Sequence, residues 1–169
     1  MATAIKTAVI PAYTLHGGPP LQKTYPEAAS QTFKRGEAVY LDGNGRVAEY
    51  TAAIDDGTQR FLGFAAEDGH NGTAGANNCS VYLGWGTVFE INVTNAGADQ
   101  TTAITQVGSG PLPLYQDTTN SIAMLDIGDT AAQGDWCRIV AISTKGLVGD
   151  TNGRVEFTLV PAALQVTGT

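Results

Sequence analysis

The sequence predicts a mainly β protein, an antiparallel β-sandwich or barrel with tight hairpins. Short runs rich in β-branched and aromatic residues are separated by turn signals about every 8 to 15 residues, the spacing typical of such folds. Glycine is abundant, at 21 of 169 residues, and most of it lies in short polar clusters with Asn and Asp. No alternation of strands with long helices appears, so an open parallel sheet is not expected.

Composition and charge exclude several classes of protein. Hydrophobic residues make up 43% of the chain and charged residues 15%, which is too apolar for a disordered protein. The net charge is −7, and the nine Lys and Arg residues are scattered singly, so we expect neither nucleic acid nor an anionic membrane as a partner. The N-terminus lacks a charged leader followed by a long apolar run; we therefore expect no signal peptide, no membrane span, and synthesis in a cytoplasm.

Residues 1–30 differ from the rest of the chain, and we predict that they form an extended arm. Four of the seven prolines lie here: Pro11, Pro19, Pro20 and Pro26. Because proline lacks an N–H donor and fixes φ, we expect no regular strand or helix in this segment. It also carries the apolar side chains Tyr13, Leu15, Leu21 and Tyr25. We expect these four to contact a neighbouring molecule; an arm folded back on its own domain is the alternative.

The remainder, residues 31–169, is predicted to form one compact β domain that folds without the arm, with two lobes (about 31–94 and 95–169) as an alternative. Its clearest segment is FKRGEAVYLDGNGRVAEY, residues 33–50, which reads as a hairpin. The turn residues Gly43, Asn44 and Gly45 tolerate positive φ. Asp150, Asn152 and Gly153 repeat this pattern near the end of the chain, in LVGDTNGRVEF. We expect type I′ turns at both places, with positive φ at Gly45 and Gly153.

Other strands and short helices follow from the same signals. Further strands are predicted at residues 60–68, 79–93, 113–117, 121–127, 136–144 and 153–162. In the longest run, Gly84 and Gly86 flank Trp85, which suggests a β-bulge or a close backbone approach. We allow at most two short helices, one within residues 97–108 and a single turn within 51–59.

The residues that could carry chemistry form no recognisable constellation. His16 and His70 lie in loops flanked by glycine, and Glu67 and Asp68 beside His70 are typical of a solvated turn. Neither Cys79 nor Cys137 has a neighbouring His or a CxxC partner. We interpret the cysteines as separate buried side chains, with a disulfide as the alternative. We expect no enzyme activity, no cofactor and no metal site.

Two binding functions need to be weighed against this expectation. The segments DGNG and DTNG begin like calcium-binding loops, but Arg46 and Arg154 stand where further oxygen ligands are required, so we interpret both as turns. Exposed Trp85 and Trp136 would suggest a carbohydrate-binding module. Their apolar neighbours favour packing in the core instead.

The order of segments gives a further indication of function. In sequence they are FKRGEAVYLDGNGRV, FLGFAAEDG, GTVFEINV, a GADQT…PLY segment, and GDTNGRVEFTLVP. Together they resemble the capsid decoration (cement) proteins of tailed bacteriophages, over most of residues 30–161. FLGFAAED and the closing GDTNGRV turn are the most specific pieces.

This resemblance implies a β-rich structural protein without enzyme activity. It implies a homotrimer that binds the outer surface of the phage head in the virion, after synthesis in the host bacterium. Its partner would be the major capsid protein, whose neighbouring subunits it bridges. A carbohydrate-binding β-sandwich is the alternative function, and exposure of the two tryptophans distinguishes the two. An enzyme on the same fold has no support in the sequence.

Overall fold

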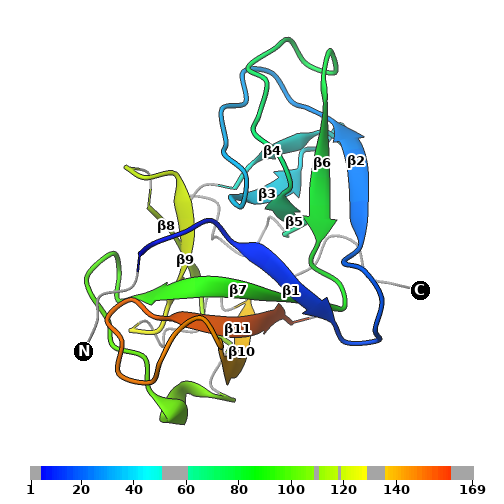
Figure 1. Cartoon of the computed structure of the whole chain (residues 1–169). Helices are drawn as coiled ribbons and strands as arrows, with labels where there is room; N and C mark the ends of the chain where they lie inside the picture. The colour runs from blue at the N-terminus through cyan, green and yellow to red at the C-terminus, as the bar shows by residue number, and fades with distance from the viewer. Residues whose placement is uncertain (1–4, 51–60, 109–110, 118, 129–135, 161–169) are drawn as a thin grey trace.

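The computed structural model describes residues 5–50, 61–108, 111–117, 119–128 and 136–160, which form two β-sheets and a single 3-10 turn, η2 (Ile104–Gln106) (Figure 1). The six-stranded sheet contains β1 (Ile10–Thr14), β7 (Thr87–Thr94), β8 (Leu114–Asp117), β9 (Ile122–Asp126), β10 (Cys137–Ile142) and β11 (Arg154–Leu159). The five-stranded sheet contains β2 (Gln22–Pro26), β3 (Ala38–Leu41), β4 (Val47–Glu49), β5 (Gly63–Ala65) and β6 (Asn78–Leu83). The mainly β prediction is confirmed, and the architecture is sandwich-like rather than a closed barrel.

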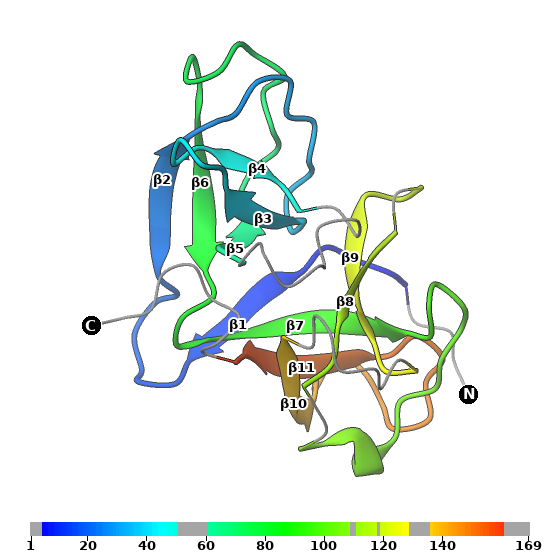
Figure 2. The same cartoon turned by 180° about the vertical axis from the view of Figure 1, so that it is seen from behind.

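One pair of neighbouring strands is parallel, whereas the sequence predicted antiparallel pairing. The six-stranded sheet has the order β10-β11-β7-β9-β8 (Figure 2). β1 and β9 pair with different parts of β7: β1 with residues 87–90 and β9 with residues 93–94. β7 and β9 are parallel, with Val93 opposite Leu125, whereas the other strand pairs of both sheets are antiparallel. The β8–β9 hairpin returns the chain to β7 in this direction, and no local sequence signal specifies that return.

The two sheets share an aromatic core. Phe64 of the five-stranded sheet lies 4.8 Å from Phe89 and 5.9 Å from Phe157, ring centre to ring centre, both on the six-stranded sheet. All three side chains are fully buried. Strand β3 alternates as its sequence predicts: Ala38 faces this core, and Val39 faces a second, smaller core on the other side of its sheet. Both faces of that sheet are therefore covered, which fixes its register.

The longest predicted strand is two strands in different sheets. Residues 79–93 were expected to form one run, but β6 ends at Leu83 and β7 begins at Thr87. Gly84 and Gly86 form the connection between the sheets, and Gly86 has a φ of 65°. Both glycines approach other backbone segments: Gly84 N–H donates to the Leu62 carbonyl at 3.1 Å, and the Gly86 carbonyl accepts from Leu15 N–H at 2.9 Å. At Gly63 the approach leaves no space for a side chain, because an added Cβ would clash with the carbonyl oxygen of Tyr82.

The N-terminal segment contains two regular strands, so the expectation of none is wrong. β1 pairs with β7 and β2 pairs with β6, which places one strand in each sheet. The prolines are tolerated because Pro11 precedes a register shift in β1 and Pro26 ends β2 at the edge of its sheet. In addition, Val9 is buried in the core. The described part of the arm is extended, and it folds onto its own domain.

The first predicted hairpin is present with a different turn. Asp42 and Arg46 pair across a three-residue loop, with Asp42 N–H donating to the Arg46 carbonyl at 2.8 Å. Gly45 has a φ of 73°, as predicted, whereas Asn44 does not have positive φ. A type I′ turn requires positive φ at both central residues, so the type I′ prediction is wrong, and the left-handed residue is the last of the loop. The Asp42 carboxylate favours this turn by accepting from the N–H groups of Asn44 (2.8 Å) and Arg46 (2.9 Å).

The second predicted hairpin is not a tight turn. The long connection 143–153 joins β10 to β11. Within the predicted turn, residues 150–153, the residue with positive φ is Asn152, at 52°, rather than Gly153. The Asn152 side chain ties this loop to an earlier segment, donating to Asp99 at 2.6 Å. Glycine is required at position 153 by space, because a Cβ there would lie 2.7 Å from the Thr102 methyl group.

The predictions of short helices and of buried cysteines have different outcomes. Residues 97–108 contain the 3-10 turn η2 in place of an α-helix, and the turn expected within 51–59 lies outside the described residues. Cys79 and Cys137 are both buried and are not joined in a disulfide, as interpreted from the sequence. Within the described part of the chain, none of the helical structure is long and apolar enough to span a membrane.

Candidate interaction surface

Three of the four predicted contact residues are exposed at one end of the molecule. Tyr13, Leu15 and Leu21 are 45%, 56% and 44% exposed, on strand β1 and the connection that follows it. Figure 1 shows this connection as the blue turn at the lower right. Tyr25, the fourth, is half-buried, and its side chain packs against the smaller core of its own chain. Whether any of the four contacts another molecule stays a prediction.

The turn between β1 and β2 is held by its backbone. Leu15 N–H donates to the Gly86 carbonyl at 2.9 Å, which fixes the turn to the connection between the sheets. Gly17 and Gly18 have φ values of 75° and 91°, a conformation that favours glycine, and this explains the Gly-Gly pair in the sequence. The Thr14 hydroxyl closes the turn by donating to the Gly18 carbonyl at 3.1 Å.

A hollow of about 350 Å³ lies at this turn. Its apolar walls are Pro19, Leu21 and Trp85, and His16 also lines it. The rings of His16 and Trp85 lie 6.0 Å apart, centre to centre. We call Tyr13, Leu15, His16, Leu21 and Trp85 the turn patch.

The two tryptophans differ in their surroundings. Trp85 is 38% exposed, so the prediction that it packs in the core is wrong. It lies in the connection between β6 and β7 rather than in a strand. Trp136 packs against the main core, as predicted. The glycines flanking Trp85 were the sequence signal for this difference, because they mark irregular backbone rather than a strand interior.

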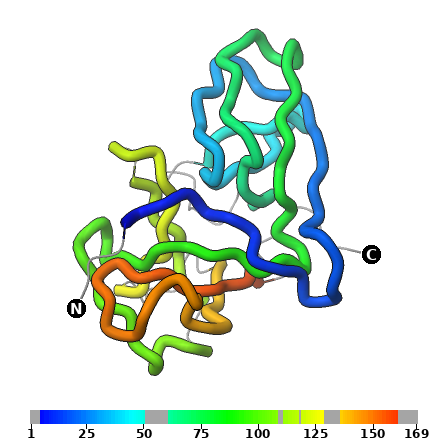
Figure 3. The backbone as a smooth tube through the Cα atoms, in the orientation of Figure 1, coloured from blue at the N-terminus to red at the C-terminus, as the bar shows by residue number. Residues whose placement is uncertain are grey.

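A second set of exposed apolar side chains lies at the other end of the six-stranded sheet. We call it the loop patch; its members are Ile104, Val107, Leu147 and Val148, which are 64%, 37%, 70% and 57% exposed. Thr102 holds the two loops together, since its hydroxyl donates to the Leu147 carbonyl at 2.7 Å and its carbonyl accepts from Gly149 at 2.8 Å. In Figure 3 these green and orange segments lie side by side. The sequence did not predict this patch, because Leu147 and Val148 begin the segment LVGDTNGRVEF, which reads as a hairpin.

The histidine and cysteine side chains considered for catalysis, His70 and Cys79, are held by contacts within the fold. His70 Nδ1 lies 3.1 Å from a carboxylate oxygen of Glu27, which is buried, and the same carboxylate accepts from the His70 N–H. Burial, with the nearby charges of Glu67 and Glu27, raises the pKa of the Cys79 thiol to about 12, so little reactive thiolate forms near neutral pH.

The possible calcium loops are also accounted for by turn structure. Asp42 accepts from two backbone N–H groups, and Asp150 accepts from the N–H of Leu147 at 3.0 Å. Across the described ranges, no three His, Cys, Asp or Glu side chains lie close enough together to hold a metal ion.

No protein-family model matches the chain, and no curated protein matches its sequence. Exposed apolar patches on a folded protein are candidate contact sites for other molecules.

Proposed function

We propose that this protein is a capsid decoration protein, which binds the outer surface of a bacteriophage head as a homotrimer and bridges neighbouring major capsid subunits. The observation that carries this proposal is the pair of apolar patches, whose loops lie at opposite ends of the six-stranded sheet (Figure 1). A protein that joins neighbouring subunits needs at least two contact surfaces at a fixed separation. The turn patch and the loop patch meet this requirement.

The rigidity of the connection between the patches also supports the proposal. β7 runs through the middle of the six-stranded sheet, and all eight of its residues are buried. β1 leads from this sheet directly into the turn patch, and β11 follows the loop patch. A load applied to one patch is therefore transmitted through paired strands rather than through a flexible linker.

The charge of the chain is consistent with a place outside the packaged genome. At −7, it provides no electrostatic attraction to DNA phosphates. A decoration protein that binds the outside of the shell requires shape and apolar contact, and no reactive group. The resemblance of segment order to capsid decoration proteins points in the same direction.

The proposal is tested by co-sedimentation with expanded phage heads that lack the protein. We expect the purified protein to sediment with heads of the phage that encodes it, and to saturate at a fixed number of copies per capsid subunit. The double variant Leu15→Ser/Leu21→Ser should bind about tenfold or more weakly, because it removes exposed apolar contact area while touching no core residue. Thr24→Ala, on an exposed position of β2, serves as the matched control.

Two results would overturn this proposal. One is the absence of binding to heads at saturating protein concentration. The other is a double variant that binds as well as the control, which would remove the turn patch from the contact. Sedimentation equilibrium of the free protein tests the homotrimer separately, since assembly on the capsid does not require assembly in solution.

A second candidate function, carbohydrate binding, is favoured by one observation. The exposed ring of Trp85 borders the hollow beside His16, and a sugar ring stacks well on an exposed indole. In a Trp136→Phe variant, Trp85 is the single tryptophan and reports directly on this hollow. A saturable change in its emission with bacterial cell-wall oligosaccharides, lost in Trp85→Ala, would favour this candidate over capsid decoration.

A further inference from the structure

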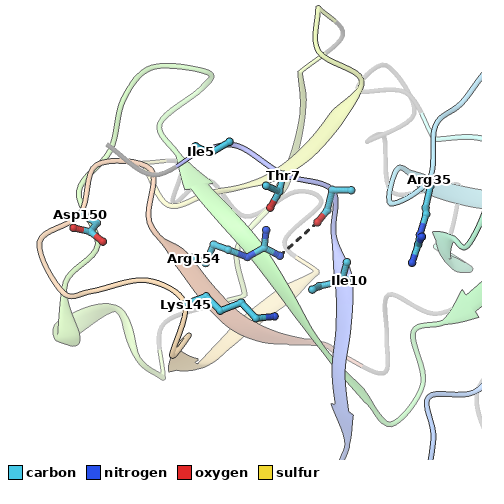
Figure 4. A pocket seen from close by; sticks show the side chains of 8 residues that line it. Ile5, Thr7, Ile10, Arg35, Lys145, Asp150 and Arg154 are labelled. Carbon is cyan, nitrogen blue, oxygen red and sulfur yellow. Dashed lines mark hydrogen bonds between the residues drawn. The ribbon is translucent and has the colours of Figure 1, made fainter. Parts of the chain in front are cut away.

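A second and larger cavity, of about 680 Å³, lies beside the six-stranded sheet, away from the turn patch. Its apolar wall is formed by Ile5, Ala8 and Ile10 of the N-terminal segment, and its cationic groups are Arg35, Lys145 and Arg154 (Figure 4). A volume of this size falls in the usual range for ligand sites, which is roughly 300 to 1,000 Å³.

Close backbone contacts assemble this cavity from distant parts of the chain. The side chain of Asn92 fixes the N-terminal segment, accepting from Thr7 N–H at 3.0 Å and donating to the Ile5 carbonyl at 3.3 Å. Gly36, with a φ of 84°, lets the turn that carries Arg35 lie against this segment; a Cβ there would lie 2.7 Å from the backbone nitrogen of Val9. An arginine from the five-stranded side is thereby placed at a cavity of the other sheet.

The cavity concentrates positive charge in a chain whose net charge is −7. It holds three of the nine Lys and Arg residues. One buried carboxylate, Glu90, is shared by two of them: its Oε2 lies 2.8 Å from Lys145 Nζ and 3.6 Å from Arg154 Nε. Arg35 makes no ion pair with any described residue, and it is exposed. Asp150 is the acidic residue in the cavity lining. It lies on the opposite side of Figure 4 from Arg35, and its carboxylate accepts from Leu147 N–H.

Arg154 has unused hydrogen-bonding capacity although it is buried. Its side chain is 8% exposed, and Nη2 donates to the carbonyls of Glu90 (2.9 Å) and Ala8 (3.4 Å). Nε is buried without a hydrogen-bond partner. A buried donor without an acceptor is destabilising, and such groups are rare in folded proteins. Figure 4 shows the guanidinium pointing toward the N-terminal segment that walls the cavity.

We propose that this cavity binds a carboxylate carried by a peptide segment of a protein partner, an Asp or Glu side chain flanked by apolar residues. A guanidinium matches the planar carboxylate with paired N–H donors, and Arg35 supplies a guanidinium that has no ion pair within the described chain. Ile5, which is 83% exposed, and Ile10 provide apolar surface for the flanking residues. The net negative charge of the chain disfavours an extended polyanion such as DNA, whereas a single carboxylate experiences mainly the local cations. This inference does not rest on the proposed role in capsid decoration.

The test uses a short peptide and amide chemical shifts of the full-length protein. Acetyl-Leu-Glu-Leu-amide is titrated into ¹⁵N-labelled protein at low salt. We expect saturable shifts at Thr7, Ala8 and Ile10, with a dissociation constant on the order of 1 mM, as for a small fragment with one ionic contact. Acetyl-Leu-Gln-Leu-amide, which has the same shape without the charge, should bind at least about tenfold more weakly.

Two charge-removing variants give a matched comparison. Arg35→Gln removes the exposed guanidinium and leaves the backbone N–H of this residue free to keep its bond to Asp68 (2.9 Å). It should weaken binding of the Glu peptide about five- to tenfold. Arg138→Gln, an exposed position on β10 outside the cavity, changes the net charge equally and should leave the dissociation constant within about twofold.

Three results would overturn the inference. The first is a set of equal affinities for the Glu and Gln peptides. The second is an equal change in the dissociation constant of the Glu peptide in Arg35→Gln and Arg138→Gln, which would show that only the net charge of the protein matters. The third is inorganic phosphate binding at the same residues as tightly as the Glu peptide, because the apolar wall would then contribute nothing and the site would be one for free anions.

Discussion

Gly45 and Gly153 occupy similar sequences and are required for different physical reasons. At Gly45 the backbone is left-handed, and a Cβ added there would meet open space, with nothing within 4 Å. At Gly153 φ is not in the left-handed region, and Thr102 fills the space where a Cβ would lie. The sequence indicates that both positions favour glycine. It does not show which constraint applies, because Thr102 lies 51 positions away (153 − 102) and contacts Gly153 only in the fold.

These two constraints predict different responses to asparagine. Gly45→Ala should cost about 1 kcal/mol in the free energy of unfolding, and Gly45→Asn should recover part of that loss because Asn tolerates positive φ. Gly153→Ala should cost about 1–3 kcal/mol through the clash with Thr102, and Gly153→Asn should cost more than Gly153→Ala. Urea denaturation measures all four. A mild effect of Gly153→Asn would contradict the steric account.

The cysteines should be unreactive in the native protein. Burial raises the pKa of Cys79 to about 12, and both thiols are inaccessible. At pH 8 we expect a thiol reagent such as 5,5′-dithiobis(2-nitrobenzoate) to modify neither cysteine in the folded protein, and to modify two per chain after denaturation without reductant. Rapid native modification of one thiol would contradict the burial, and fewer than two thiols after denaturation would indicate a disulfide.

At the scale of the element, β7 is central because it carries a buried carboxylate on one face and the aromatic core on the other. Burial raises the pKa of Glu90, but hydrogen bonds from Lys145 and Ser143 and the charges of Lys145 and Arg154 outweigh it, so the pKa is lowered from 4.5. A carboxylate with a depressed folded-state pKa contributes stability above its unfolded-state pKa, and that contribution is lost as the pH falls through the folded-state value.

This linkage predicts a pH-dependent effect of Lys145→Gln. At pH 7 the variant should be less stable by about 1 kcal/mol, a modest value because Lys145 is largely exposed. Well below pH 4.5, where Glu90 is protonated in both proteins, the difference should approach zero. Denaturation curves at both pH values measure it, and Arg138→Gln is the control. A difference that persists unchanged in acid would show that Lys145 acts through packing rather than charge.

Local sequence patterns predict the hairpin and late strands of this fold better than its beginning. Strands β3, β4, β8, β9, β10 and β11 lie within predicted segments because alternation and turn signals agree there. β1 and β2 were missed because prolines dominate the local signal, although a bulge and a sheet edge accommodate them. The sheet change between β6 and β7, the parallel β9 and the exposure of Trp85 depend on contacts distant in sequence. Composition alone singled out Tyr13, Leu15 and Leu21, which are exposed, and their contact with another molecule stays a prediction. Arg35 and Arg154 could not be grouped from the sequence, because they come to the same cavity only in the fold.

For the whole molecule, the N-terminal segment is expected to be necessary for folding. Deleting residues 2–26 removes a strand from each sheet and the buried Val9. We therefore expect the truncated chain to lose its cooperative thermal transition, in place of the independently folding β domain that the sequence suggested. The variant Leu15→Ser/Leu21→Ser, which keeps the strands, should melt within a few degrees of the wild type. A truncated protein with a wild-type transition would show that β1 and β2 are dispensable.

The pairing of β1 with β7 has a consequence for biosynthesis. Ile10 lies opposite Glu90. The ribosome must therefore add 80 more residues (90 − 10) after Ile10 before its partner Glu90 has been synthesised. At about 5–20 residues per second, the first strand waits roughly 4–16 s on the ribosome or beyond it with its edge unpaired. An unpaired apolar strand is a site of aggregation, and proline within or beside it opposes pairing with other chains. We therefore expect the four prolines among residues 1–26 to oppose such pairing during that interval.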